Sequence, residues 1–511
     1  GARTFLYNAE NNWFRNFGTG NAGDKNYSDM PTVTAPVYVN LNTSSVKTVE
    51  KGIFSVGNGK FVQFSTGNLQ YEVGTNTWSF ASEQYNYVGE ENINVGKPTY
   101  TGKIDMFGWS ADGKFGVNPS NKNEDYNGDF VDWGTLVNEE DWYTLSADEW
   151  KYLLNTRANA KNLKQIAKVN NGEKDIVGIM LFPDAWTMPA DVNVAAAYDD
   201  YFKVNIYNYT LEQWEKLEAV GAVFLPAAGR RAGGYGNMIN KEQVEETNSE
   251  NLNGGHYKHY DNGNIYCYYW TSTINESTKD VSYLHNIQAL GGDKYTIGTG
   301  AVWGEKGRYG QSVRLVKAIK PDYKREVRPG FYGTICLQNG GQMIGASRFE
   351  LSYYNEAQGL LYMDEADATM VAGNPYIFLP NEGADTLYVF YDKTTSDVAL
   401  TVNGLVGSFE SKPLDEDGTN YIMKDNKIKK VVGTGVSVGA NKAYIKLGDV
   451  DKNEPTPVPG RRRVAIGQAP QVATGMESVD ASAQPVKMII DGQLYILRGE
   501  KMYDAQGKLV K

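Results

Sequence analysis

The chain contains little of what would point to a scaffold held by disulfides or metal. Among its 511 residues there are two cysteines, Cys267 and Cys336, and three histidines. Two cysteines exclude a disulfide-rich scaffold and a zinc site built on cysteine ligands. They could pair if the fold joins them, but we expect two unlinked thiols.

Long apolar runs and an excess of basic residues are also missing. No run approaches the ~18 apolar residues of a membrane helix, so no membrane-spanning helix is expected. Lys and Arg total 50 against 61 Asp and Glu, a net charge of −11. This balance argues against nucleic acid as the main partner, since phosphate binding needs a basic face. The run Arg461-Arg462-Arg463 is too short to change this and is interpreted as a solvated loop.

What the chain does have favours β-structure. Hydrophobic residues make up 41%, enough for packed cores, and there are 55 Gly and 35 Tyr against 18 Phe. Many glycines and tyrosines indicate many turns and many half-exposed sheet positions. The length suggests about three domains. The chain opens on Gly1-Ala2-Arg3 with no signal peptide, so we expect it to follow a removed leader or an engineered start.

Local patterns predict particular elements in the first half of the chain. Strands 53–56 and 60–64 alternate around Gly57-Asn58-Gly59, and strands 69–73 and 78–80 form a second hairpin. Capping boxes predict two helices: residues 145–154, with Ser146 and Glu149, and residues 210–220, with Thr210 and Gln213. Further strands are expected at 177–182, 223–225, 266–273, 281–287 and 312–316.

The composition divides the chain into segments. Residues 1–47 are polar, with one strand at 37–41 and no assigned role, and 48–320 form the first domain. A polar boundary at 321–326 precedes a domain at 327–468, where evenly spaced short strands suggest a sandwich or barrel. Its strands are expected at 332–337, 360–363, 376–379, 387–391, 398–402, 442–447 and 463–466. A linker at 469–485 leads to a tail, 486–511, of two small hairpins turning at Asp491-Gly492 and Gln506-Gly507.

The first domain resembles a surface-protein family of gut Bacteroidetes. The blocks that carry the resemblance are, in chain order, Gly52-Ile53-Phe54-Ser55-Val56, residues 64–71, Phe107-Gly108-Trp109, Asp132-Trp133-Gly134, Leu145 with Glu149-Trp150, Asn155-Thr156-Arg157, residues 181–186, residues 221–230, residues 269–273 and residues 310–316. That family is related to the Fibrobacter succinogenes major paralogous domain and to variable proteins diversified by retroelements. The resemblance implies a C-type lectin-like fold, of the branch shared with formylglycine-generating enzyme.

The rest of the chain resembles other parts of Bacteroidetes surface proteins. Residues 373–378, 440–445 and 474–478 resemble their β-sandwich modules, and 490–511 look like C-terminal signals of the type IX export system. The implied fold class is therefore an α+β C-type lectin-like domain, an all-β sandwich-like domain and a small β-hairpin tail. The implied location is extracellular or attached to the outer-membrane surface.

The resemblance also implies where a ligand would bind. In the diversified relatives the ligand-contacting stretch corresponds to residues 271–309 here, whose candidates are Asn275, Tyr283, His285, Tyr295, Trp303, Arg308 and Tyr309. Trp303 also stands out by itself, because it lies in a Gly-flanked turn that would present an aromatic side chain. In the preceding Gly-rich loop, Arg231 and Tyr235 are expected to face a ligand. Core packing, rather than sugar stacking, is expected for Trp109, Trp133, Trp150, Trp186 and Trp270.

Two metal hypotheses follow from side-chain composition. Residues 118–129 concentrate oxygen donors, so Asp125 and Asp129 are the first candidate ligands for calcium. Turn formation by Asn and Asp explains this composition equally well. His256 and His259 lie in a polar loop, and a solvated pair is favoured over a zinc site.

No catalytic constellation is convincing. Formylglycine-type chemistry would need reactive cysteines together, and Cys267 stands alone in the first domain. The carboxylates at 139–141 and 245–246 are sequence neighbours, which does not hold two of them at a set separation across a sugar. We therefore expect a non-catalytic surface protein that binds a glycan or protein. The alternatives are a structural or adhesive subunit of a surface appendage or matrix, and a glycan-active hydrolase.

Overall fold

The computed structural model describes most of the chain between residues 51 and 468 and short strands outside it. The described residues are 4–8, 13–17, 51–94, 99–112, 128–137, 141–200, 204–229, 267–274, 281–290, 294–300, 310–367, 369–458, 461–468, 486–490, 493–498 and 501–504. The chain divides into two compact units, Gly1–Ser45 and Val46–Lys511. In the first unit, β1 (Thr4–Asn8) and β2 (Trp13–Phe17) pair antiparallel. The strand predicted at 37–41 lies outside the described residues.

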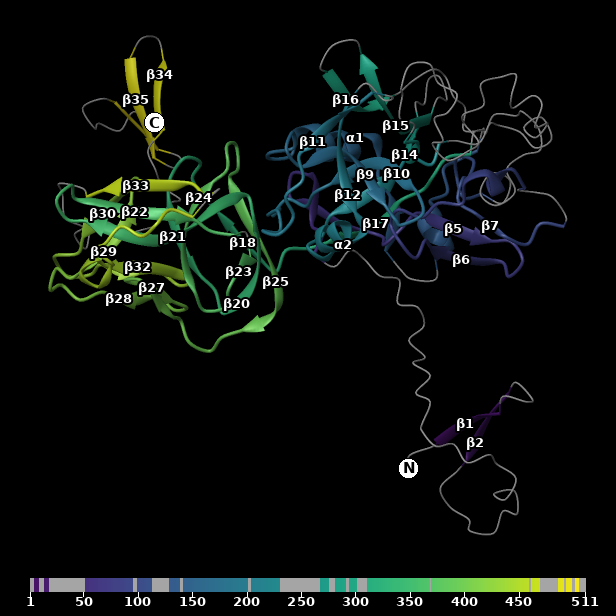
Figure 1. Ribbon diagram of the computed structural model, residues 1–511. Helices are drawn as coiled ribbons and strands as arrows, with labels where there is room; N and C mark the ends of the chain where they lie inside the picture. The colour runs from purple at the N-terminus through teal and green to yellow at the C-terminus, as the bar shows by residue number, and fades with distance from the viewer. Residues whose placement is uncertain are drawn as a thin grey trace. The chain divides into compact units, whose positions relative to one another are not determined.

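The second unit begins with a region of mixed sheets, residues 51–319, in which strands far outnumber helices (Figure 1). Its strands are β3 (Phe54–Gly57), β4 (Lys60–Phe64), β5 (Leu69–Glu72), β6 (Thr77–Phe80), β7 (Lys103–Ile104), β8 (Trp142–Thr144), β9 (Lys164–Asn170), β10 (Asp175–Leu181), β11 (Ala196–Asp199), β12 (Val204–Thr210), β13 (Val223–Pro226), β14 (Tyr269–Ile274), β15 (Val281–Leu290), β16 (Lys294–Gly300) and β17 (Leu315–Ile319). The helices are α1 (Ala147–Lys151), continued by a π-helical turn (Tyr152–Thr156), α2 (Leu211–Ala219), and 3₁₀ turns at Gly89–Asn94 and Trp133–Leu136.

Both predicted hairpins and both predicted helices are confirmed. β3 pairs with β4 and β5 with β6. At α1 the Ser146 hydroxyl accepts from the Glu149 amide while the Glu149 carboxylate accepts from the Ser146 amide. Thr210 and Gln213 make the same reciprocal pair at α2, so each helix start satisfies backbone donors that would otherwise lack a partner.

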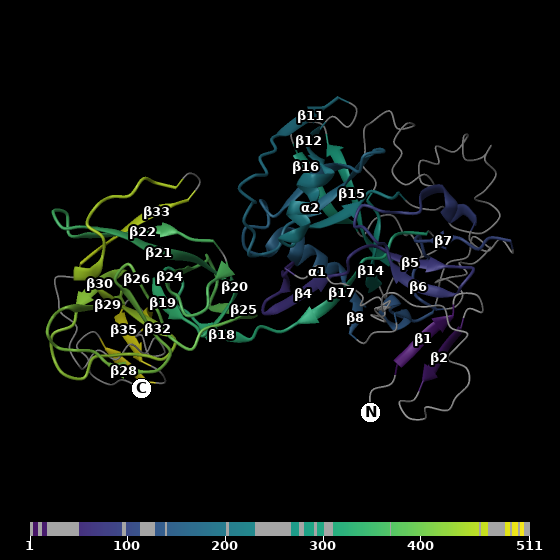
Figure 2. The ribbon, with the colours of Figure 1, turned by 60° about the horizontal axis from the view of Figure 1, so that its bottom comes forward.

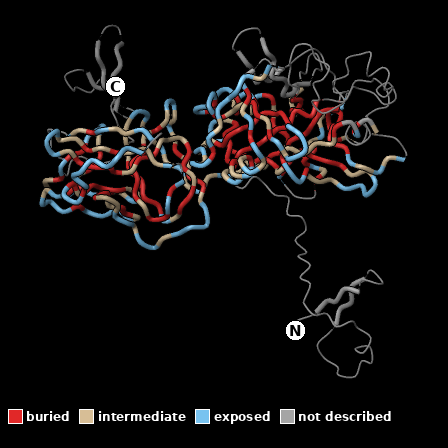
Figure 3. The backbone as a smooth tube through the Cα atoms, in the orientation of Figure 1, coloured by how far each residue is buried: buried red, intermediate tan, exposed pale blue. Residues whose placement is uncertain are grey.

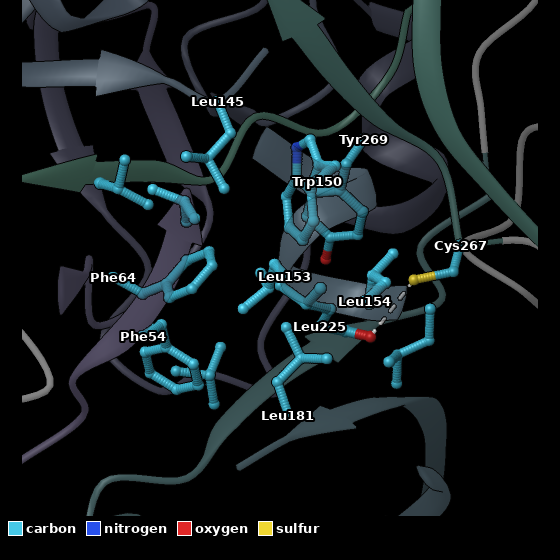
Figure 4. Close-up of a cluster of buried hydrophobic side chains, with 14 of the residues drawn as sticks. Phe54, Phe64, Leu145, Trp150, Leu153, Leu154, Leu181, Leu225, Cys267 and Tyr269 are labelled. Carbon is cyan, nitrogen blue, oxygen red and sulfur yellow. Dashed lines mark hydrogen bonds between the residues drawn. The ribbon is translucent and has the colours of Figure 1, made fainter. Parts of the chain in front are cut away.

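The first and last strands of this region meet in one sheet, β3-β4-β17-β8. Residues 61–64 of β4 pair antiparallel with 316–319 of β17. A five-stranded sheet, β11-β12-β9-β10-β13, packs beside it, and its inner strand β10 is buried from Ile176 to Leu181. Figure 4 shows side chains from both sheets and from α1 meeting in one apolar cluster, with Phe64, Trp150 and Leu225 among them.

Residues 323–467 form antiparallel sheets, seen from two sides in Figures 1 and 2. The strands are β18 (Tyr323–Glu326), β19 (Gly333–Cys336), β20 (Asn339–Ile344), β21 (Ala346–Asn355), β22 (Leu360–Glu365), β23 (Thr369–Met370), β24 (Pro375–Pro380), β25 (Thr386–Thr395), β26 (Thr401–Val402), β27 (Leu405–Ser408), β28 (Lys412–Pro413), β29 (Asn420–Lys424), β30 (Lys427–Lys430), β31 (Ser437–Val438), β32 (Lys442–Lys446) and β33 (Arg463–Gly467). A 3₁₀ turn lies at Leu447–Asp449.

These sheets share buried apolar cores. The sheet β19-β24-β21-β22-β33 shares one core with β26-β27-β32-β29-β30, through residues such as Phe349, Ile377 and Ile445. Its other face packs on β18-β25-β20-β23, through residues such as Tyr376 and Val389. Figure 3 shows the buried residues gathered along these strands and along those of residues 51–229. A β-rich chain of several sheets is therefore confirmed.

Several boundaries were predicted wrongly. The polar segment 321–326 contains strand β18, which pairs with β25, because an edge strand tolerates charged residues. Residues 312–314 precede β17 rather than start it, and of the run 398–402 only β26 is a strand. In the tail, β34 (Val486–Ile490) and β35 (Gln493–Arg498) pair around residues 491–492 as expected. β35 then pairs with β36 (Lys501–Asp504), so the second hairpin joins these two strands; residues 506–507, where the turn was predicted, lie outside the described residues.

Candidate functional site

The predicted binding stretch starts on a strand that is locked into the core. In β14, Tyr269 and Trp270 are buried, and the Trp270 indole donates to the carbonyl of Phe107 at 2.7 Å. The Trp109 indole donates to the carbonyl of Thr271 at 2.8 Å. Beyond Thr271 the strand becomes half-buried. β14 therefore carries the chain from a fixed interior position to the surface.

β14 continues into the sheet β14-β15-β16, which holds some of the predicted ligand contacts. Tyr283 of β15 lies opposite Trp270 on one side and Gly300 of β16 on the other. Tyr295 of β16 lies opposite Ala289 of β15. Residues 283 and 289 are about 20 Å apart along a strand, so these two tyrosines share a sheet but lie at different ends of it. His285 falls where the register shifts between Leu284 and Ile287.

The other predicted contacts lie outside the described residues and stay predictions. They are Asn275, Trp303, Arg308, Tyr309, Arg231 and Tyr235, together with the calcium candidate Asp125, the histidines at 256 and 259, and Glu139, Glu140, Glu245 and Glu246. The second calcium candidate, Asp129, is exposed, and its carbonyl accepts from the Ser110 hydroxyl at 3.5 Å. Within the described ranges, no group of three or more His, Cys, Asp or Glu side chains could hold a metal ion.

Both cysteines are free and buried, as expected for unlinked thiols. The Cys267 thiol donates to the carbonyl of Leu225 at 3.5 Å within the apolar cluster of Figure 4, and burial raises its pKa. Burial also raises the pKa of Cys336 to about 12. Neither thiol has the surroundings that produce a reactive thiolate.

Four of the five tryptophans that were predicted to pack in the core are core residues. Trp109, Trp133, Trp150 and Trp270 are each no more than 1% exposed. Trp186 also packs against a core cluster, as predicted, but it is only half-buried: it stacks on Phe182 with ring centroids 4.2 Å apart. It therefore lines a crevice as well.

This crevice has a volume of about 1140 Å³ and is lined by residues from both halves of the second unit. One wall comes from the turn after β3 and the segments 152–159 and 184–187; the other comes from β20, β21, residues 365–367, 379–388 and Arg461-Arg462. At its floor Phe61 packs edge-on against Tyr388 and Phe390, with ring centroids 4.9 and 5.0 Å apart. The Gln342 side chain donates to the carbonyl of Lys51 at 3.0 Å.

Ion pairs neutralise most of the charged groups in the crevice walls. Arg157 pairs with Asp184 at 2.7 Å and donates to the carbonyls of Leu153 and Phe182. On the facing wall Arg461 pairs with Asp367 at 2.9 Å, and Arg462 with Glu365 at 3.4 Å. Two of the three arginines at 461–463 therefore border a concave surface, while Arg463 is held in β33 by Asp364. The solvated-loop interpretation is confirmed for Arg461 and Arg462, which are exposed and precede β33, and is wrong for Arg463, which lies in that strand.

The crevice was missed by sequence reasoning because its parts come from distant segments. The sequence pattern pointed to Trp186 only as a core residue.

Every helix among the described residues is too short or too polar to cross a bilayer. No family model, no curated protein and no solved structure matches this chain.

Proposed function

We propose that this chain is an exported, non-catalytic binding protein that recognises a glycan or protein ligand through a C-type lectin-like domain at residues 48–320. The observation that carries the proposal is the anchoring of β14. Indole hydrogen bonds at Phe107 and Thr271 fix the root of the sheet β14-β15-β16, so its outer part is presented from a rigid base. Recognition loops on a rigid scaffold are a common arrangement in binding proteins.

The rest of the proposed arrangement assigns supporting roles. The sandwich-like domain at 327–468 acts as a stalk, and the tail at 486–511 as an export or attachment element. Calcium, with Asp125 and Asp129 as ligands, orders the loop at 118–129. A non-catalytic role agrees with the crevice carboxylates Glu365 and Asp367, each of which is ion-paired to an arginine rather than placed opposite a second free carboxylate.

A second candidate function, a structural or adhesive subunit, is favoured by one feature. β16 ends its sheet, and within the described part of the chain no strand pairs with its outer edge. An unpaired edge can add a strand from another molecule. In that case the sheet β14-β15-β16 would contact a neighbouring subunit.

A binding screen of the full chain separates these functions. The chain is tested on a glycan array and on mucin, with and without calcium, beside a Trp303→Ala, Tyr309→Ala double variant. The matched control is Tyr198→Ala, which removes a 60% exposed tyrosine from the edge strand β11. We expect glycan binding that the double variant loses and the control keeps. Absence of any glycan binding would contradict a lectin role, and pull-downs from the cell envelope would then test a protein partner or subunit.

A further inference from the structure

Arg348 is a buried cation without a protein acceptor. It lies on β21, is 4% exposed, and its guanidinium lies 4.4 Å over the ring of Tyr376 in β24. Its Nε and Nη1 atoms are enclosed and have no hydrogen-bond partner. A buried guanidinium normally receives carboxylate or carbonyl oxygens, because an unpaired buried charge is costly. Arg348 lines the crevice, and its Nη2, the one guanidinium nitrogen that is not enclosed, can donate to a ligand acceptor there.

The neighbouring arginines show that Arg348 is different. Arg461 and Arg462 each have a carboxylate partner, and Arg157 has Asp184 and three backbone carbonyls. Among these crevice arginines, Arg348 is thus the one whose guanidinium has no carboxylate at hydrogen-bond distance. The exposed acidic residues Glu382 and Asp385 also line the crevice, and the chain as a whole carries −11. A densely charged polyanion would be repelled, whereas a ligand with one isolated carboxylate would not.

The remaining lining suits sugar rings. Trp186 offers a half-exposed ring held by its stack on Phe182, and Tyr388 contributes a second aromatic surface. Asn58, Asn159 and Asn381 add amides that can donate to and accept from hydroxyl groups. The volume of about 1140 Å³ exceeds the ~300–1,000 Å³ of a site for one drug-sized molecule. An oligomeric ligand therefore fits better than a single small molecule.

We infer that this crevice is a second binding site, for an oligosaccharide that carries a carboxylate, with Arg348 receiving the carboxylate and Trp186 stacking on a sugar ring. A hydrogen bond from this guanidinium to a carboxylate is charge-assisted, which positions the acidic sugar. The site is independent of the sheet β14-β15-β16. The two walls enclose it together, so both halves of the second unit contribute to recognition.

Titration calorimetry on the full chain tests this inference. The probes are sialyllactose against lactose, and glucuronosyl-xylotriose against xylotriose; each acidic probe carries one carboxylate, so the two pairs separate a sialic acid carboxylate from a uronic acid carboxylate. We expect at least one acidic saccharide to bind ten-fold or more tightly than its neutral partner. Arg348→Gln should weaken that binding at least ten-fold, and Arg348→Lys should weaken it less. Trp186→Ala should weaken the binding of acidic and of neutral saccharides by similar factors.

The control is Arg328→Gln, which removes an exposed arginine that pairs with Asp425 at 3.5 Å and does not line the crevice. It should bind like the wild type, as should the Trp303→Ala, Tyr309→Ala variant. Thermal melting of each variant verifies folding. The inference is overturned if no acidic saccharide binds, if Arg348→Gln binds as the wild type does, or if a glutamate-rich peptide binds where saccharides do not.

Discussion

The two halves of the second unit surround a buried arginine with different hydrogen-bond acceptors. In residues 51–319, Arg157 is 3% exposed and has an aspartate and three backbone carbonyls as acceptors. In residues 321–468, Arg348 is equally buried, yet it rests on an aromatic ring with two nitrogens unsatisfied. Arg157 thus uses its hydrogen-bond donors within the fold. Arg348 has guanidinium donors that the fold does not use.

The two halves also differ in their aromatic residues. The chain has ten, and none lies beyond residue 303. The described ones pack mainly in cores, whereas the second half uses tyrosine and phenylalanine under arginines, as at Arg325 on Phe378 and Arg463 on Tyr353. Tryptophan fluorescence therefore reports on the first part of the chain alone, which allows the stability of the two halves to be followed separately.

The largest effect is expected from Arg157→Met. Removing the cation leaves Asp184, whose side chain is 9% exposed, as a buried unpaired carboxylate, which costs about 3–5 kcal/mol. Urea unfolding followed by tryptophan fluorescence measures the loss. Lys151→Met is the control, because the Lys151–Asp148 pair is exposed and its removal should not change the midpoint measurably. Equal urea midpoints for both variants would show that the buried Arg157 contributes no more to stability than the exposed Lys151.

A buried carboxylate in the same half gives the next effect. Asp105 is buried, accepts hydrogen bonds from Asn92 and from the Val88 amide, and has its pKa raised by burial to about 6. The native state then holds a proton that the unfolded state releases near 3.8, so stability falls as pH rises from about 4 to about 6. The fall corresponds to about 3 kcal/mol. In D105N this part of the pH dependence should vanish, as urea midpoints across pH 4–7 would show; identical slopes in both proteins would count against it.

In the second half, Arg463→Lys should cost about 1 kcal/mol. Arg463 holds Asp364 with two hydrogen bonds, of 2.6 and 2.9 Å, and also reaches Glu454 at 3.0 Å. Lysine keeps the charge but cannot form the two-pronged contact. Hydrogen exchange of residues 463–467 should become faster by several-fold, whereas Arg328→Lys should leave it unchanged. Unchanged exchange in R463K would mean that charge alone holds β33.

The smallest effect on stability is expected from Arg348→Met. An apolar side chain of similar length over Tyr376 removes a buried cation that has no acceptor, and such replacements are often neutral or stabilising. Thermal melting should give a midpoint equal to or above that of the wild type. A loss as large as that of Arg157→Met would show that Arg348 serves the fold and would remove the contrast between the halves.

The sequence predicts correctly the elements that depend on residues close together in the chain. The hairpin at Gly57-Asn58-Gly59 and the capping boxes at Ser146 and Thr210 depend on residues within a few positions of each other, so the sequence predicts them correctly. Strands β20 and β21 were not predicted, because β20 contains the pair Gly340-Gly341 and β21 contains the charged residues Arg348 and Glu350. Their pairing with β24 and β25, which lie further along the chain, forms them.

By itself, the sequence determined a β-rich chain of several sheets, two capped helices, two unlinked thiols and the burial of four tryptophans. Only the tertiary structure decided that Trp186 lines a crevice, that Arg461 and Arg462 border it, and that Arg348 is buried beside it without a hydrogen-bond acceptor. An alternating strand places every second side chain on one face, but which face is covered depends on strands and segments far away in sequence. The acceptors that a buried charge finds depend on the same packing.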